Sequence, residues 1–358
     1  MDSSPFLPAG RTNTIADVPG LKVGNAVDLD AASGVSVVIP DEPAVAAVDV
    51  RGGGPGERET ALLKPGTLVE RVDALFLSGG SAFGLDAGGG VMQWLVGQRR
   101  GYRIADVRVP IVPGAILFDL LNGGHKPWSK PPSDSDLVAH DLLEPNHPPY
   151  RRLGFEACAN ACKNVRQGNV GAGFGAKSGR LKGGLGSASS ILPSGAIVGS
   201  LAAVNSRGNV ADAATGVPLA AATARPGDFP GVSSTGSARD MGGAGDSEGR
   251  HGRTNTTICI VATNAALSKA EAERVAMLAH DGLARSINPV HTLFDGDIVF
   301  ALSTAKKILP EGQERASALV ELGNEVANCL ARAVFRGVLF AETLNDLICY
   351  RENYGLGK

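Results

Sequence analysis

An asparagine–threonine pair in this chain has the chemistry needed to cut its own backbone. Asn255 and Thr256 stand between a long segment of small residues and the β-branched run 257–263. The Thr256 hydroxyl could attack the Asn255 carbonyl carbon and move the acyl group from nitrogen to oxygen, after which water would cleave the ester. The freed α-amine, with an ordinary pKa of about 8, could then serve as a base for the same hydroxyl. An ordinary loop-to-strand junction is the alternative, because Asn-Thr pairs are common.

The composition is globular, with an unusual amount of glycine. Of 358 residues, 43% are hydrophobic and 48 are glycine, in runs such as 51–56, 79–90 and 183–186. Glycine clusters without a fixed period indicate tight turns and closely packed backbones. The net charge of −2 gives no basic footprint for nucleic acid.

Targeting signals and cysteine usage indicate a cytoplasmic protein. Residues 1–5 have no basic region followed by an apolar core, so no signal peptide is expected. No stretch reaches the roughly 18 apolar residues of a membrane span. The five cysteines form no CxxC pair, which argues against zinc and favours reduced, mostly buried thiols. We expect no nucleic-acid or membrane partner.

The first half of the chain alternates short apolar runs with glycine turns. This pattern predicts strands at 35–39, 45–50, 74–77 and 108–112. Helices are expected at 81–96, with Ser81 as the N-cap, and at about 150–164. The segment 125–149 is rich in Pro, Ser, Asp and His and is expected to form a surface excursion.

The second half supplies the strands that would position Thr256. Residues 185–192 and 196–205 predict a hairpin buried on both faces, and 206–254 predicts a mobile loop that ends at the suspected bond. A capping box at Ser268 predicts a helix to about Ser286, followed by a strand at 297–303 and a helix at 313–340. Paired apolar strands with helices for both outer faces favour an α/β fold of the αββα sandwich type over a doubly wound parallel sheet.

Ordered motifs along the chain resemble one enzyme family. They are TNTIADVPGLKVG at 12–24, DVRGG at 49–53, LSGGSAFGL at 77–85, GNVGAG at 168–173, KGGLG at 182–186, NTTI at 255–258 and PVHTLFDGD at 289–297. Together they resemble the L-aminopeptidase/D-amidase-esterase family, which includes β-peptidyl aminopeptidases and nylon-oligomer hydrolases.

This resemblance implies a fold similar to that of N-terminal nucleophile hydrolases, with the connectivity shared by this family and the ornithine acetyltransferases. It also implies one domain over 1–358, self-cleaved into 1–255 and 256–358. The two chains would stay associated in a homo-oligomer, such as a tetramer. The implied substrate is a small peptide or amide, cut by aminopeptidase or ω-amide hydrolysis. No cofactor and no metal are implied.

By position in these motifs, Thr256 is the implied nucleophile for both processing and turnover. Asn205 follows the apolar run 202–204, where its amide could donate to the oxyanion of a tetrahedral intermediate. The alternative for Asn205 is a residue that ends a strand and begins a turn.

Two carboxylates also fall in a family motif. If Asp295 and Asp297 lie in extended backbone, they point to the same side and could together hold the Thr256 amine. A turn built on Asp-Gly, or a divalent-metal site with His291, is the alternative.

A basic residue near the nucleophile is also implied. Gapless counting from Gly171 selects Arg180, whereas the KGGLG motif selects Lys182. The sequence does not decide between them, and either could be a solvated turn residue.

One position pair departs from the family. Relatives that trim free N-termini have a glutamate and a tyrosine where this chain has Ile116 and Phe118. Without the glutamate an obvious partner for a substrate ammonium is missing, so an internal or ω-amide substrate is an alternative to an aminopeptidase substrate.

Three other functions remain as alternatives. The glycine-rich run 171–178 resembles a phosphate loop, but Ala176 replaces its second glycine and 163–167 is too polar for the preceding strand. Ornithine acetyltransferase-like acyl transfer would keep the fold, although its usual cleavage sequence is Ala-Thr. A non-catalytic scaffold would remain uncut.

Overall fold

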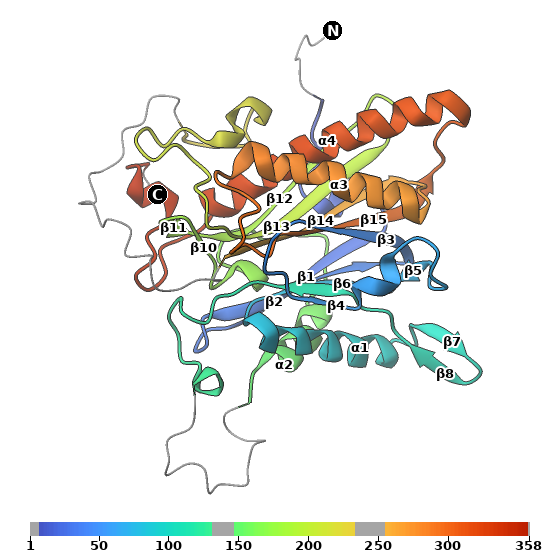
Figure 1. Cartoon of the computed structure of the whole chain (residues 1–358), viewed down its shortest axis with the longest axis horizontal. Helices are drawn as coiled ribbons and strands as arrows, with labels where there is room; N and C mark the ends of the chain where they lie inside the picture. The colour runs from blue at the N-terminus through green and yellow to red at the C-terminus, as the bar shows by residue number, and fades with distance from the viewer. Residues whose placement is uncertain (1–6, 131–146, 233–254, 357–358) are drawn as a thin grey trace, which may run out of the picture.

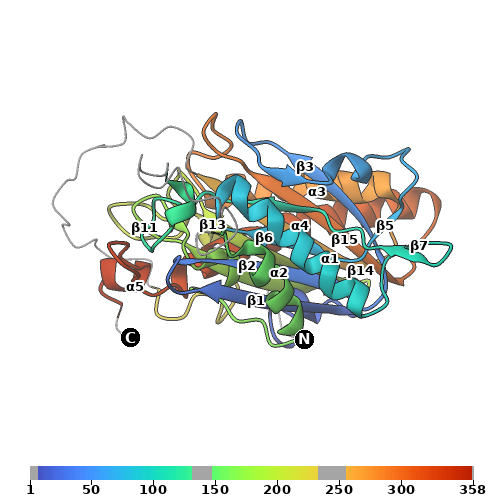
Figure 2. The same ribbon diagram turned by 90° about the horizontal axis from the view of Figure 1, so that it is seen from below.

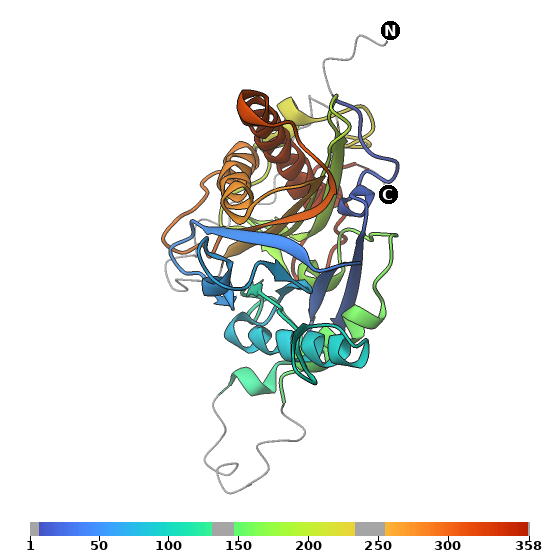
Figure 3. The ribbon, with the colours of Figure 1, turned by 90° about the vertical axis from the view of Figure 1, so that its right-hand side faces the viewer.

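Two β-sheets packed face to face form the centre of the molecule, with two helices on each outer face (Figure 1). The computed structural model describes residues 7–130, 147–232 and 255–356. Seen from the side, the four layers follow one another as helices, sheet, sheet, helices (Figure 3). The predicted αββα architecture is confirmed.

The larger sheet has six strands in the order β12-β13-β14-β15-β3-β5. Its neighbours pair antiparallel except β14 and β15, which are parallel. The strands are β12 (Gly184–Ile191), β13 (Ile197–Asn205), β14 (Thr256–Ala265), β15 (Ile298–Lys307), β3 (Ala44–Val50) and β5 (Arg71–Val72).

The smaller sheet has five strands in the order β1-β2-β6-β9-β4. β6 and β9 are parallel, and the other neighbours are antiparallel. The strands are β1 (Leu21–Asp28), β2 (Ser33–Pro40), β6 (Leu75–Ser78), β9 (Gly114–Ile116) and β4 (Glu57–Arg58).

Three apolar layers hold the sandwich together. The middle layer fills the space between the sheets with side chains such as Leu77, Leu201 and Ile260. Helices α3 (Lys269–Ser286) and α4 (Gly312–Leu339) cover the six-stranded sheet. Helices α1 (Ala87–Gly97) and α2 (Tyr150–Ala159) cover the five-stranded sheet (Figure 2). Strands buried on both faces explain the nearly continuous apolar runs in the sequence.

Glycines allow helices to approach the sheets closely. A Cβ atom on Gly186 of β12 would lie 2.0 Å from the Ala333 carbonyl oxygen of α4, and one on Gly24 of β1 would lie 1.7 Å from that of Ala157 in α2. No side chain fits at either position, so these two contacts require glycine.

Short elements complete the described chain. They are α5 (Tyr350–Asn353), the hairpins β7 (Tyr102–Ile104) with β8 (Val107–Val109) and β10 (Lys177–Ser178) with β11 (Leu181–Lys182), and the 3₁₀ turns η1 (Ile15–Asp17), η2 (Thr60–Leu63), η3 (Ser81–Asp86), η4 (Pro127–Ser129), η5 (Gly171–Gly173) and η6 (Leu219–Thr223).

Several sequence-based boundaries change. Gly80, with φ +86°, precedes η3, and Ser81 lies inside that turn at φ 52°, so the prediction of Ser81 as an α-helical N-cap is wrong. The predicted strand 108–112 is only the exposed β8. The helix predicted to end near residue 164 ends at Ala159. The capping box at Ser268 is confirmed by the Glu271 amide, which donates to the Ser268 hydroxyl.

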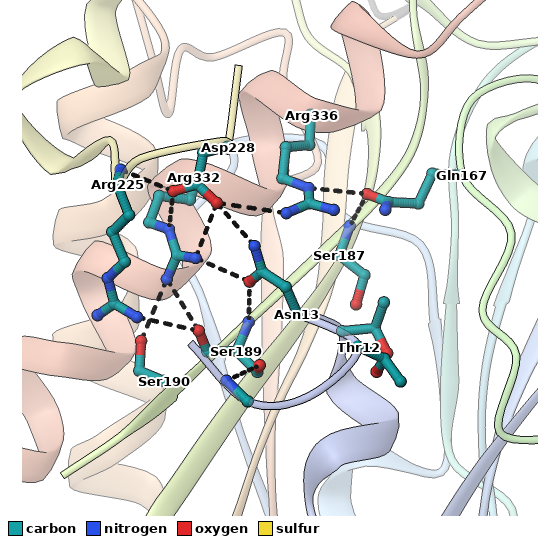
Figure 4. Close-up of polar contacts among 12 residues, drawn as sticks. Thr12, Asn13, Gln167, Ser187, Ser189, Ser190, Arg225, Asp228, Arg332 and Arg336 are labelled. Atoms are coloured by element: carbon teal, nitrogen blue, oxygen red, sulfur yellow. Dashed lines mark hydrogen bonds and ion pairs between the residues drawn. The ribbon is translucent and has the colours of Figure 1, made fainter. Parts of the chain in front are cut away.

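The segment predicted as a mobile loop differs in its first part. Residues 206–232 contain η6 and place Arg225 and Asp228 in the interior, while 233–254 lie outside the described residues. Arg332 on α4 makes two contacts with Asp228, at 2.6 and 3.0 Å (Figure 4), and Arg225 pairs with Glu325. Buried ion pairs with α4 hold this segment together with a few buried apolar side chains such as Val210, so its low apolar content does not make it a loop.

Four of the five cysteines are buried and Cys162 is exposed, so the predicted burial of most thiols is confirmed. No helix in the described ranges is long and apolar enough to cross a membrane.

Candidate active site

Thr256 is the first residue of β14, at the end of the six-stranded sheet. Its antiparallel partner in the ladder is Asn205, the last residue of β13. On the other side, β15 runs parallel to β14 and begins at Ile298, so the Asp297 backbone lies at the same end of the sheet. Strand pairing therefore brings three of the predicted site residues together from distant parts of the sequence.

The Asn255–Thr256 peptide bond is held by two donors. The Thr256 hydroxyl donates to the Asn255 carbonyl oxygen at 2.5 Å, and the Gly296 amide donates to the same oxygen at 3.1 Å. Thr256 is only 5% exposed. The hydroxyl thus lies beside the carbonyl that it would attack, and a backbone N–H polarises that carbonyl as an oxyanion donor would.

Gly296 lies against the Thr256 side chain. A Cβ atom at position 296 would come within 2.8 Å of the Thr256 Oγ1 atom and of the Gly54 carbonyl oxygen. Gly296 belongs to the motif at 289–297, but no local pattern assigns it a role. Its one signal in the sequence is a glycine between Asp295 and Asp297.

Asp297 holds the backbone next to the candidate nucleophile. Its Oδ1 atom accepts from the Thr257 amide at 2.7 Å, and its Oδ2 atom accepts from the His291 amide at 3.1 Å and contacts His291 Nδ1 at 2.8 Å. The residue is 1% exposed.

Asp295 is equally buried but has different partners. Its Oδ2 atom accepts from the Thr292 amide and hydroxyl, at 2.8 and 2.6 Å. Burial, reinforced by the nearby Asp297 charge, raises the Asp295 pKa. Asp295 sits in an isolated bridge with Asn255 rather than in a strand, so the two carboxylates are neighbours without sharing partners.

The contacts of the Asn205 side chain include hydrogen bonds to three described residues. Its amide nitrogen donates to the Phe118 carbonyl oxygen at 3.0 Å. Its Oδ1 atom accepts from the Lys177 amide at 2.9 Å and from the Asn122 side chain at 3.4 Å. Phe118, one of the two departures from the family pattern, therefore lies beside Asn205. Asn122 was missed in the sequence because nothing local marks it.

The two basic candidates lie in different environments. Lys182 is fully buried, and its Nζ atom donates to the carbonyl oxygens of Gly173 and Gly183 at 3.1 and 2.9 Å. Burial lowers the Lys182 pKa to about 7. Arg180 is exposed in the β10–β11 hairpin. Lys182 ends β11, just before β12 begins at Gly184, and neither basic side chain contacts Thr256 in the described structure.

Ile116 is buried in β9 and lies against Gly56, where an added Cβ would come within 2.3 Å of the Ile116 Cδ1 atom. An apolar side chain therefore occupies the position that, by the family resemblance, would carry a glutamate in an enzyme that trims free N-termini. In the described ranges, no three His, Cys, Asp or Glu side chains are grouped so that they could hold a metal ion.

Comparison with known proteins gives a family match over most of the chain. The model of peptidase family S58 matches residues 13–347. An uncharacterized aminopeptidase of Mycobacterium tuberculosis is 43% identical, covering 96% of this chain and 98% of its own length. A 6-aminohexanoate-oligomer endohydrolase of Kocuria sp. is 29% identical, covering 86% and 80%.

Solved structures show the same fold at low identity. The L-aminopeptidase D-Ala-esterase/amidase of Ochrobactrum anthropi, described as a variant of the Ntn hydrolase fold, superposes with a TM-score of 0.65 at 20% identity and covers 98% of this chain and 97% of its own. A β-aminopeptidase of Burkholderia sp. gives 0.62 at 21%, covering 93% and 88%.

The family match spans most of the chain and favours the hydrolase over the acyltransferase, nucleotide-binding and scaffold alternatives. The chain belongs to peptidase family S58 and is a hydrolase of peptide or amide bonds.

Proposed function

We propose that the chain cleaves itself between Asn255 and Thr256 and then hydrolyses amides with Thr256 as an N-terminal nucleophile. The observation that carries this proposal is the pair of donors on the Asn255 carbonyl oxygen, the Thr256 hydroxyl at 2.5 Å and the Gly296 amide at 3.1 Å. One donor can become the nucleophile while the other stabilises the oxyanion.

Processing begins when Thr256 Oγ1 bonds to the Asn255 carbonyl carbon as its proton leaves. The C–N bond then breaks, the nitrogen takes up a proton, and an ester links Asn255 to Thr256. Water hydrolyses this ester to give an Asn255 carboxylate and a free Thr256 amine. The products are the chains 1–255 and 256–358, which together form one αββα domain.

In turnover, the Thr256 amine accepts the hydroxyl proton while Oγ1 attacks the substrate carbonyl carbon. The leaving amine takes a proton, and water then hydrolyses the acyl-enzyme. We assign oxyanion stabilisation to Asn205, orientation and charge of the new amine to Asp295 and Asp297, and a positive or proton-donating role to Lys182. The exposed Arg180 receives no role in this mechanism.

The apolar Ile116 supports a substrate without an ammonium group at that position. We therefore propose an internal or ω-amide rather than a free N-terminal residue as the preferred substrate. The kcat/KM for a free-amine peptide and for its N-acetylated counterpart would be compared. A strong preference for the free amine would overturn this assignment of substrate while leaving the nucleophile intact.

The processed chains would stay together because strands of one chain pair with strands of the other. β13 of the first chain pairs with β14 of the second, and β3 of the first pairs with β15 of the second. The ion pair between Asp228 and Arg332 also joins the two chains (Figure 4). We further propose a homo-oligomer of the processed protein, which analytical ultracentrifugation would test. The five free cysteines support a reducing, cytoplasmic location.

The test of the proposed chemistry compares Thr256→Ala with Thr256→Ser. We expect the alanine variant to remain one uncut, inactive chain, and the serine variant to cleave and turn over slowly, because serine retains the hydroxyl. An active alanine variant would remove Thr256 from the mechanism.

A further inference from the structure

A line of polar contacts leads from Asp297 away from the nucleophile. Asp297 Oδ2 lies 2.8 Å from His291 Nδ1. His291 Nε2 lies 3.3 Å from His280 Nδ1, and His280 Nε2 lies 3.1 Å from the Asp49 carbonyl oxygen. Three consecutive hydrogen bonds thus connect a buried carboxylate beside β14 to the backbone of β3.

The two histidines are held firmly by the fold. His280 lies on α3 and is fully buried. His291 has φ 54°, a left-handed conformation that is uncommon for a residue other than glycine. Their rings meet edge to face, with centroids 4.8 Å apart. The backbone around His291 therefore accepts an unfavourable conformation in which this contact is made.

The number of hydrogens that these three hydrogen bonds need can be compared with the number that the two imidazoles supply. Both ends of the line, the Asp297 carboxylate and the Asp49 carbonyl, are acceptors, so each of the three contacts needs its own hydrogen. Two neutral imidazoles supply only two. One extra proton must therefore reside in the line for all three bonds to form.

The environment favours the Asp297 end for this proton. Burial lowers the His280 pKa to about 4, so His280 remains neutral and donates from Nε2 to the Asp49 carbonyl. His280 Nδ1 is then the acceptor, and His291 donates from both of its nitrogens. The charged groups facing the two rings are Asp49, whose Oδ2 is 3.5 Å from His280 Nε2, Arg51, which pairs with Asp49 at 2.7 Å, and Asp297.

We propose that His291 and His280 are positioning residues that hold one extra proton against Asp297, and so fix the charge of Asp297 and its hydrogen bond to the Thr257 amide. This inference rests on the proposed function, since the bond to Thr257 aligns the residue that follows the nucleophile. The positive His291 offsets one of the two negative charges that Asp295 and Asp297 would otherwise place beside Thr256. Without it, the two carboxylates would raise the pKa of the new amine. More of the amine would then be protonated near neutral pH and unable to accept the hydroxyl proton.

Asp49 also borders a cavity. Its Oδ2 atom lies 3.5 Å from His280 Nε2, and Asp49 lines a cavity of about 360 Å³ together with Glu57 and Glu273.

The first test measures protonation directly and needs no activity. Nitrogen-15 histidine NMR on the uncut Thr256→Ala chain should show one histidine with both ring nitrogens protonated and coupled to a neutral neighbour at pH 7. Assignment uses His291→Asn and His280→Leu. Two neutral histidines at positions 280 and 291 would overturn the proposal, whether or not the chain processes itself.

The second test uses the pH profile of the processed enzyme. In His291→Asn, which can still donate to Asp297 but carries no charge, we expect kcat to fall about tenfold. In the plot of kcat against pH, we also expect the change in kcat that accompanies loss of the shared proton to disappear. KM should change little. The matched control is His125→Asn, an exposed histidine 3.3 Å from Asp30, which should behave like the parent. A His291→Asn profile that retains the shape of the parent profile would overturn the proposal.

Discussion

Replacing Gly296 with alanine should slow cleavage of the Asn255–Thr256 bond. The added Cβ would lie 2.8 Å from Thr256 Oγ1 and 2.8 Å from the Gly54 carbonyl oxygen. Ordinary van der Waals contact begins at about 3.4 Å, so the hydroxyl or the loop must move by roughly half an ångström. Since a displacement of about 1 Å can cost about 100-fold in rate, we expect cleavage to slow about tenfold.

The matched control is Gly54→Ala in the same site. Its Cβ would have no neighbour closer than the Asp295 carbonyl oxygen at 3.8 Å, so its cleavage rate should match that of the parent. Both rates are measured by following loss of the full-length chain by intact mass after rapid purification. If the two variants cleave equally fast, the placement of the Thr256 hydroxyl against Gly296 has no bearing on processing.

Three further predictions concern Asn205, Lys182 and Arg332. Asn205→Ala should lower kcat on a cleaved enzyme by about 100- to 1,000-fold through loss of an oxyanion donor; an unchanged kcat would exclude that role. Burial depresses the pKa of Lys182 to about 7 in the folded chain. Above that pH the unfolded chain therefore binds one more proton than the folded chain. The free energy of unfolding of the wild type should then rise with pH, relative to that of Lys182→Met, between pH 7 and the ordinary lysine pKa. The gain is on the order of 2 kcal/mol from about pH 7 to 9, measured by urea unfolding, and a constant difference would contradict it. Arg332→Met should cost about 3–5 kcal/mol of unfolding free energy by leaving Asp228 buried without its two-contact partner; a neutral effect on urea unfolding would show that the network tolerates the loss.

The sequence predicted the parts of the site that depend on local pattern. Thr256 and Asn205 stand at the ends of apolar runs, and strand pairing places such ends together. The layers followed from apolar strands that need cover on both faces. Asp295 and Asp297 were recognised as a pair, but their separate partners depend on the loop that carries them.

The remaining features depend on contacts between distant segments. His280 is one residue of an amphipathic helix, and only the packing of α3 against β3 brings it to His291. The difference in burial between Lys182 and Arg180, two positions of one hairpin, cannot be read from the sequence. The order of residues 206–232 could not be predicted from composition, because ion pairs with α4 hold the segment in addition to a few buried apolar side chains such as Val210.

The most direct test of the central claim follows cleavage and activity in one preparation of freshly made protein. Intact mass reports the fraction of the 36.6 kDa chain that has been cut, N-terminal sequencing identifies the new end, and amide hydrolysis is measured in the same samples. We predict a fragment that begins Thr-Thr-Ile-Cys and activity that rises in proportion to it. Full activity in samples whose chain is still whole would contradict the account.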